Sequence, residues 1–273
     1  MLKIVLIISW LVGYGILVWR AWRWAFVLLV AVLPIYLIRL KIGGLPTTLL
    51  ELMFWLLFVK WLIDKIKRQE FSAHFWRRRH PYPFSSGIIW LVLAAFVGLA
   101  VSGFSWSALG IYRAYFVEAS LFFVLAFHFF KNPLNRPLVW RALAGSAIAI
   151  GLISIYQWIN GEYWAGGGER ITSIFPYPNA VGLFLGPIVV LLFFVAAENL
   201  RIKKAKEAVI LGGGVILGLA AIVLAKSDGA LIAVAVAIWL GLWGLGRRGA
   251  ISAILIALAG LVFLGYNPQE REN

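Results

Sequence analysis

The sequence predicts an all-α fold, a polytopic transmembrane bundle of about nine to ten helices, and three observations predict it. The chain has 273 residues, of which 63% are hydrophobic and only 13% are charged, a composition foreign to water-soluble domains. Its apolar runs are continuous rather than alternating, which favours membrane helices over a barrel, whose strands alternate apolar and polar residues. Short polar breaks separate these runs, so we expect one integral membrane domain over residues 1–273.

Ten apolar segments follow one another along the chain. A helix that crosses the hydrocarbon core needs roughly 20 apolar residues, and several segments reach that length, whereas the second is short. The predicted segments are 2–19, 24–38, 45–63, 86–103, 112–130, 139–158, 177–197, 207–225, 229–246 and 250–266. No small-residue cleavage site follows the first segment, which we interpret as a membrane anchor rather than a removable signal.

Lys and Arg gather in alternate breaks between these segments. The breaks after residues 63, 130, 197 and 246 fall on one side if each segment between them crosses once, and the positive-inside rule makes that side cytoplasmic. The breaks near 104–111, 159–176 and 226–228 then face outward. We expect a multi-pass protein of the cytoplasmic (inner) membrane. Its N-terminus is outside if there are ten crossings, and inside if the first two segments make only one.

The net charge of +14 does not predict a nucleic-acid partner, because the basic residues are scattered between apolar runs. The positive-inside rule and the attraction of basic residues to anionic lipid headgroups already explain these charges, so membrane lipids are the expected partners. The absence of cysteine excludes disulfides, iron–sulfur clusters and thiolate zinc sites, and only three histidines are present. We therefore expect neither a metal nor a cofactor.

One outward break combines charges with helix breakers. Gly166–Gly168 predicts a flexible loop that carries Arg170, and Pro176 and Pro178 keep the following backbone extended. Asn179 then stands where the next helix needs an N-cap. A guanidinium beside a helix start suits a phosphate at the membrane surface. The alternative is that Arg170 is an ordinary loop charge and that Asn179 only caps the helix.

Other intramembrane groups have alternative roles. Glu118 follows Arg113 by five residues within a helix, where it can pair with an outward arginine, contact a donor substrate or couple to protons. Asp228 can form a local salt bridge with Lys226. The spacing of Gly214 and Gly218 lets two helices approach closely, inside this bundle or across a dimer.

The run from Arg170 to Leu185, RITSIFPYPNAVGLFL, resembles the signature of the O-antigen ligase and polymerase superfamily, in which an arginine precedes a Phe-x-x-Pro-Asn-x-x-Gly element. Three further stretches are similar to that family in the same order. They are residues 34–39 with 44–51, residues 109–118, and residues 226–230, the last similar to a Ser-Arg-Gly-Ala element.

This resemblance implies a metal-independent, inverting glycosyltransferase that acts in lipopolysaccharide or other envelope polysaccharide biosynthesis. The implied donor is a glycan on undecaprenyl diphosphate, and the acceptor is a hydroxyl of a lipid, glycan or protein outside the membrane. The substrate-binding residues would be Arg170, Asn179, Lys226, Arg113 and Glu118. Fixed cations suit this chemistry because a departing diphosphate needs electrostatic stabilisation.

Two departures from the family pattern affect this expectation. Asp228 occupies the arginine position of the Ser-Arg-Gly-Ala element, although Lys226 can supply a cation nearby. The family's histidine base lies in a large loop expected beyond Asn273, so the sequence identifies no catalytic residue and indicates the N-terminal part of a ligase. His74, His80 and His128 are predicted at the inner side. Alternatives are a polymerase of the same superfamily, a polyprenyl-linked glycan transporter or flippase, and a non-catalytic scaffold.

Overall fold

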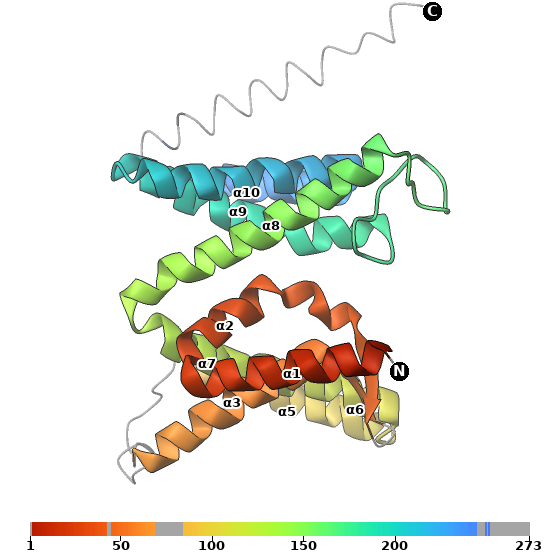
Figure 1. Cartoon of the computed structure of the whole chain (residues 1–273), viewed down its shortest axis with the longest axis vertical. Helices are drawn as coiled ribbons and strands as arrows, with labels where there is room; N and C mark the ends of the chain where they lie inside the picture. Colours follow the sequence, from red (N-terminus) through yellow and green to blue (C-terminus); the bar gives the residue numbers. More distant parts are fainter. Residues whose placement is uncertain (1, 43–44, 69–83, 245–248, 250, 252–273) are drawn as a thin grey trace, which may run out of the picture. The chain divides into compact units, whose positions relative to one another are not determined.

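The computed structural model describes residues 2–42, 45–68, 84–244, 249 and 251, and these are predominantly helical, which confirms the all-α class (Figure 1). Apart from Ile251, the tenth predicted segment lies outside them. The chain divides into two compact units, residues 1–142 and 143–273, which are described separately below.

The first unit contains most of the short elements. Helix α1 is followed by a shorter helix α2, a 3-10 turn and a small hairpin, and helix α3 comes next. A long helical segment then consists of α6, the π-helix η2 and α7 without interruption. The bounds are α1 Leu2–Arg20, α2 Trp22–Ala31, η1 Leu33–Leu37, β1 Arg39–Ile42, β2 Leu45–Thr48, α3 Leu49–Lys67, α5 Ser85–Val101, α6 Trp106–Ile111, η2 Tyr112–Glu118, α7 Ala119–Phe130 and η3 Pro133–Asn135.

The second predicted segment, 24–38, is helical over only part of its length. Helix α2 ends at Ala31, and the chain continues as a 3-10 turn with Pro34 near its start. Proline lacks an N–H and disfavours the α conformation in the residue before it, which explains the early end. The Tyr14 hydroxyl on α1 donates a hydrogen bond of 3.2 Å to the carbonyl of Ala25 on α2. Helices α1 and α2 are therefore two separate helices that pack on each other.

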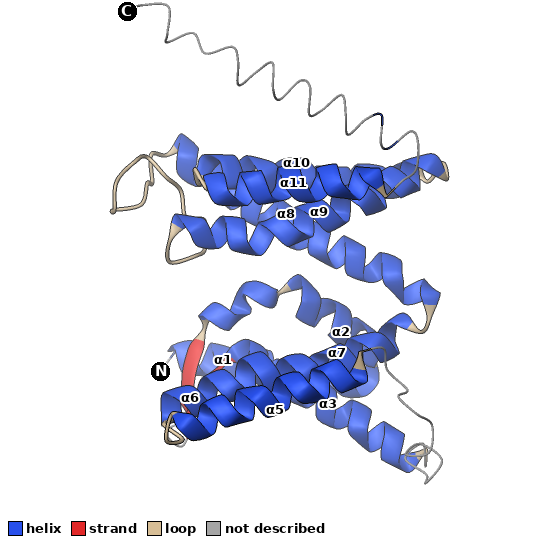
Figure 2. Cartoon of the chain, turned by 180° about the vertical axis from the view of Figure 1, so that it is seen from behind, coloured by secondary structure: helices blue, strands red, loops and turns tan. Residues whose placement is uncertain are grey.

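An antiparallel β-hairpin precedes α3, and sequence analysis did not predict it. Arg39 pairs with Thr48 and Leu40 with Thr47, and strand β2 contacts α6. Figure 2 shows the two short strands in red. Thr48 also begins α3, because its hydroxyl accepts a hydrogen bond from the amide of Glu51. The hairpin thus sets the position of the first turn of α3.

Aromatic rings fill the core between α2, α3 and α7. Phe26 of α2 stacks on Phe129 of α7 with ring centroids 4.0 Å apart, and it also stacks on Phe122 at 5.7 Å. Phe26 and Phe129 are fully buried, as are Met53 and Leu57 of α3. Offset aromatic stacking adds to the free energy gained from burying these large side chains.

Over its described residues, the second unit contains four helices, with a long loop between α8 and α9 and short connections after α9 and α10. Helix α8 begins in the first unit and continues into the second, and α9 packs chiefly on α10 and α11. The bounds are α8 Arg136–Ile159, α9 Pro178–Arg201, α10 Ala205–Leu224 and α11 Asp228–Trp243. Figure 1 draws α8 in green, α9 in teal and α10 in blue.

The GxxxG pair lies at an internal interface of this unit. A Cβ on Gly214 would come within 3.0 Å of the Cα of Ala144, and one on Gly218 would lie 2.7 Å from Val189. The glycines of α10 therefore permit close contact with α8 and α9. This confirms the internal-packing interpretation of the pair.

Among the residues that the structure describes, five helical segments are long and apolar enough to cross a membrane, which indicates a membrane-embedded protein. They are Leu2–Arg20, Trp106–Phe130, Pro133–Ile159, Pro178–Arg201 and Ala205–Leu224. Helices α2, α5 and α11 are apolar but shorter. Helix α3 has the length for a crossing, but it carries Glu51, Lys60, Asp64 and Lys65 within one bilayer's length.

Candidate functional site

The loop between α8 and α9 has a closed backbone structure that displays Arg170. The Trp164 amide donates to the carbonyl of Arg170 at 2.8 Å, and the Gly167 amide donates back to Trp164 at 3.1 Å. Gly167 and Gly168 have positive φ, and so does Glu169, for which this conformation is uncommon. The glycines predicted to make the loop flexible therefore form a specific turn.

Arg170 connects this loop to two other elements. Its Nε donates a hydrogen bond of 2.9 Å to the carbonyl of Ala225, directly after α10. Its Nη2 donates to the side-chain oxygen of Asn179, in the first turn of α9. The amide of Ile171 adds a bond to the carbonyl of Leu224. The guanidinium is therefore held where α9 begins and α10 ends.

Lys226 reaches the same loop from the connection between α10 and α11. Its Nζ donates a hydrogen bond of 2.8 Å to the carbonyl of Gly168, and its own backbone has a φ of 47°. Two breaks predicted to face outward, 159–176 and 226–228, are thus adjacent. Three of the predicted site residues, Arg170, Asn179 and Lys226, lie in this one cluster, which we call the Arg170 cluster.

Asn179 does not have the capping role predicted for it. Helix α9 begins at Pro178, Tyr177 is its N-cap residue, and no side chain caps it. The fixed φ of proline suits the first helical position, so Asn179 is already inside the helix, where the capping geometry is not possible. Its side-chain oxygen instead accepts the hydrogen bond from Arg170.

The two cations of this cluster have neutral acceptors. Within the described ranges, no carboxylate lies within salt-bridge distance of Arg170 or Lys226, and the expected Lys226–Asp228 salt bridge does not form. Asp228 opens α11 instead, where a negative charge is favourable beside the helix dipole. The cluster therefore presents two positive charges, one of them on an exposed lysine, that carbonyl and amide oxygens hold in place.

Gly182, one turn into α9, lies where close packing leaves no room for a side chain. A Cβ at this position would lie 2.5 Å from the Cβ of Ala230 and 2.6 Å from the Oγ of Ser227. Ser227 is buried directly after Lys226. The absence of a side chain at Gly182 thus lets the start of α11 pack against α9, and this contact fixes the backbone that carries Lys226.

Arg113 and Glu118 belong to a second cluster, in the first unit. Arg113 pairs with Glu51 through Nη2, and the same nitrogen donates 2.9 Å to the carbonyl of Pro46. Its Nε lies 3.2 Å from an oxygen of Glu118, an ion pair that lacks hydrogen-bond geometry. The expected pairing of Glu118 with an arginine is confirmed, whereas its donor contact and proton coupling stay predictions.

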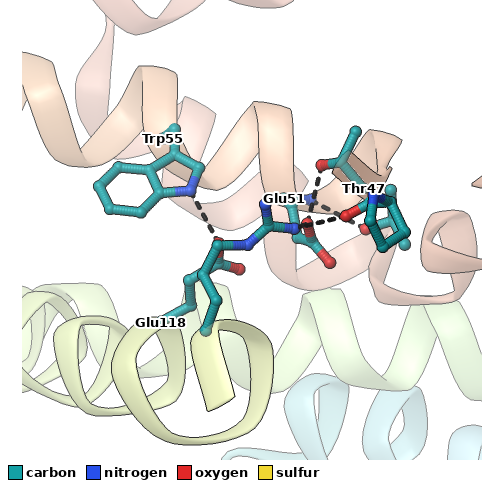
Figure 3. Close-up of polar contacts among 7 residues, drawn as sticks. Thr47, Glu51, Trp55 and Glu118 are labelled. Carbon is teal, nitrogen blue, oxygen red and sulfur yellow. Dashed lines mark hydrogen bonds and ion pairs between the residues drawn. The ribbon is translucent and has the colours of Figure 1, made fainter. Parts of the chain in front are cut away.

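Two further side chains complete this cluster, which we call the Arg113 cluster. The indole N–H of Trp55 donates 2.8 Å to Glu118, and the hydroxyl of Thr47 donates 2.8 Å to Glu51 (Figure 3). Figure 3 shows the indole of Trp55 directed toward Glu118 and the carboxylate of Glu51 beside Thr47; Trp55 and Glu51 both belong to α3. Arg113 and Glu118 lie at the two ends of the wide π-helical turn η2. Sequence reasoning missed Trp55 and Thr47, whose types and spacing gave no signal of this contact.

His128, the one histidine among the described residues, belongs to neither cluster. His128 lies among aromatic rings, with centroid distances of 6.3 Å to Trp22 and 5.9 Å to Trp61. His74 and His80 lie outside the described residues. Among the residues that the structure describes, no group of three or more His, Asp or Glu side chains is arranged to hold a metal ion.

Fold and site together describe an all-α chain whose apolar helices indicate membrane embedding, with a cationic loop cluster in one unit and a partly buried ion cluster in the other. Comparison with known proteins adds no closer identification. No protein-family model matches the chain, and neither a curated protein nor a solved structure matches it.

Proposed function

We propose that this chain is an O-antigen ligase-like membrane glycosyltransferase. It would move a glycan from undecaprenyl diphosphate to an acceptor hydroxyl on the outer face of the cytoplasmic membrane, in envelope polysaccharide biosynthesis. The observation that supports this proposal is the convergence of Arg170, Asn179 and Lys226 from separate parts of the chain. These residues carry the sequence resemblance, and together they have the chemistry of a diphosphate receptor.

In this proposal, Arg170 and Lys226 hold the diphosphate of the donor. Arg170 uses Nε and Nη2 for its protein contacts, and within the described part of the chain its Nη1 has no acceptor. Lys226 uses one donor of its ammonium for Gly168 and has two more. Charge builds up on the diphosphate as the glycosidic bond breaks. Cations already held in position stabilise that charge without reorganisation.

Asn179 has a positioning role in this scheme. Its amide oxygen holds the guanidinium beside the start of α9, where the first-turn amides also favour an anion. The guanidinium and the helix start then act on the same phosphate. The proposal assigns the role of general base to none of the described residues, and it includes nine to ten membrane crossings with the Arg170 cluster on the outer side.

Two other functions make different predictions for the same site. A polymerase of the same superfamily would use the same diphosphate receptor but a growing glycan as its acceptor. A transporter or flippase of polyprenyl-linked glycans would carry the donor across the bilayer, so a defect at Arg170 would lower the amount of donor in the outer leaflet.

The Arg170→Ala variant tests the proposal when two quantities are scored in the same cells. One is the amount of glycan attached to the acceptor, and the other is the amount of lipid-linked donor in the outer leaflet. We expect attachment to fail while donor accumulates outside. Arg201→Ala, which changes an exposed arginine at the far end of α9, is the matched control. Loss of outer-leaflet donor in Arg170→Ala would favour transport and contradict the ligase proposal.

A further inference from the structure

The first unit contains a pocket that the proposed function does not use. Its volume is about 840 Å³, and it lies between α2, η1, the β-hairpin, α3 and the α6–η2–α7 segment. Much of its wall is apolar and is formed by Leu29, Leu33, Phe54, Ile111 and Phe122. Ligand pockets typically measure 300–1,000 Å³, so this one has room for a large part of an amphiphile.

Two cations on strand β1 line the same pocket. Arg39 and Lys41 are two residues apart on the strand, which places them on the same face of the hairpin. Both side chains are exposed, and within the described ranges neither forms an ion pair or a side-chain hydrogen bond. Their positive charges are thus available to a ligand.

The other charges of the wall are satisfied internally. Glu51, Arg113 and Glu118 line the pocket, but both carboxylates pair with Arg113 and accept further hydrogen bonds from Thr47 and Trp55. Two carboxylates and three cations, counting Arg39 and Lys41, give the wall a net charge of +1. A ligand with an anionic group therefore matches the unpaired charges, whereas an ammonium group would face carboxylates that already have donors.

We propose that this pocket binds a membrane lipid whose phosphate headgroup has a net negative charge and no ammonium group. Its hydrocarbon would occupy the apolar wall, and its phosphate would bind Arg39 and Lys41. A guanidinium and an ammonium two residues apart can both donate to one phosphate. In a membrane, the hydrocarbon chains of any lipid can fill the apolar wall. The two cations therefore determine which headgroup the pocket prefers. No residue of the Arg170 cluster lines this pocket, so lipid binding here is independent of the proposed function.

The test measures lipid retained by the full chain in native mass spectrometry. The purified protein is exposed equally to phosphatidylglycerol and phosphatidylcholine, and we expect one phosphatidylglycerol to be retained in preference. In Arg39→Gln/Lys41→Gln that preference should fall about tenfold, which corresponds to about 1.4 kcal/mol. The matched control is Lys3→Gln/Arg20→Gln, which changes two cations of α1 that do not line the pocket. Equal retention of both lipids by the unmodified chain, or an unchanged preference in the double variant, would overturn the proposal.

A second pair of variants tests the apolar part of the pocket. Ala119 lines the pocket, so Ala119→Trp should lower retention of both lipids by filling the space. Ala94→Trp makes the same change at an exposed position of α5 outside the lining and should leave retention unchanged. Inorganic phosphate is the competitor that separates a lipid from a free anion. If it displaced phosphatidylglycerol, or if Ala119→Trp retained lipid fully, the lipid assignment would be wrong.

Discussion

Arg170 donates a hydrogen bond from its guanidinium to the side-chain oxygen of Asn179, nine residues later in the chain. The contact crosses from the loop after α8 to the first turn of α9, and Lys226 contacts the same loop by donating a hydrogen bond to the carbonyl of Gly168. An amide acceptor orients the guanidinium without neutralising its charge. A substitution at residue 179 can therefore distinguish the role of this contact in folding from its proposed role in anion binding.

Asn179→Asp should keep the fold and weaken anion binding. The new carboxylate would pair with Arg170 and would also be favourable at the helix N-terminus, which contributes about 0.3–1 kcal/mol. The thermal midpoint should stay the same or rise, while the affinity for geranylgeranyl diphosphate should fall at least about tenfold, or 1.4 kcal/mol. Thermal unfolding and a binding titration on the same sample measure the two effects.

The control for this variant is Asn199→Asp, on the same helix α9 but at its other end. It should leave diphosphate affinity unchanged. If Asn179→Asp bound the diphosphate as tightly as the unmodified chain, the Arg170 cluster would be a structural contact only.

Gly182→Ala should destabilise the second unit. The added methyl group would lie 2.5 Å from Ala230 and 2.6 Å from Ser227, which is too close for van der Waals contact, so α11 would have to shift. Overpacking of this kind costs about 1–3 kcal/mol. A lower thermal midpoint in detergent is the expected result.

Gly212→Ala is the matched control, because a Cβ there meets no atom within 4 Å. Replacing a glycine inside α10 should stabilise the helix by about 0.5–1 kcal/mol. The two Gly→Ala variants should therefore move the thermal midpoint in opposite directions, and a shift in the same direction would contradict the close packing at Gly182.

Arg113→Gln should destabilise the first unit more than Glu118→Gln does. Removing the guanidinium leaves Glu51 and Glu118 near each other without a cation, at a cost of about 1–3 kcal/mol for the partly buried group. Glu118→Gln keeps an amide oxygen for the indole of Trp55 and leaves Arg113 paired with Glu51. Thermal unfolding of both variants measures the difference.

The double variant Arg113→Gln/Glu118→Gln removes both the cation and one of the two carboxylates. It should recover part of the stability lost in Arg113→Gln alone, because fewer charges are left unpaired. A double variant less stable than either single variant would show that the cluster contributes mainly through packing.

Gly218→Leu should disrupt the helix packing of the second unit rather than an assembly of chains. The new side chain would collide with Val189, since even a Cβ would lie 2.7 Å from that residue. A lower thermal midpoint with no change in oligomeric state, measured by light scattering, is the expected result. A loss of dimers without a loss of stability would instead indicate that this face contacts a second chain.

Much of the helical framework was predictable from local sequence. The segments 177–197 and 207–225 correspond closely to α9 and α10, because continuous apolar runs bounded by polar breaks allow only one secondary structure in lipid. Counting crossings between basic breaks predicted that Lys226 and the loop of Arg170 face the same side, and the structure brings the two into contact. Which side of the membrane these breaks face stays a prediction.

The features that were missed depend on contacts between distant residues. The capping role of Asn179 was wrong because Pro178 starts the helix one residue earlier, and the partner of Asn179 is an arginine outside it. Glu51 meets Arg113 only because the hairpin and the π-helix bring α3 and η2 together. The hairpin itself had a signal, since Gly43 and Gly44 separate two short runs, a pattern typical of a two-residue turn.

The π-helix from Tyr112 to Glu118 shifts the angular positions of side chains around the axis of the long segment 106–130. A wide turn contains one residue more than the surrounding α-helix would use. A helical wheel drawn from α7 therefore assigns α6 the wrong faces, by about 100°. Deleting Ala114 would restore a uniform helix and would rotate Arg113 away from Glu51. The charge cluster of the first unit thus depends on the number of residues in this turn as well as on their identity.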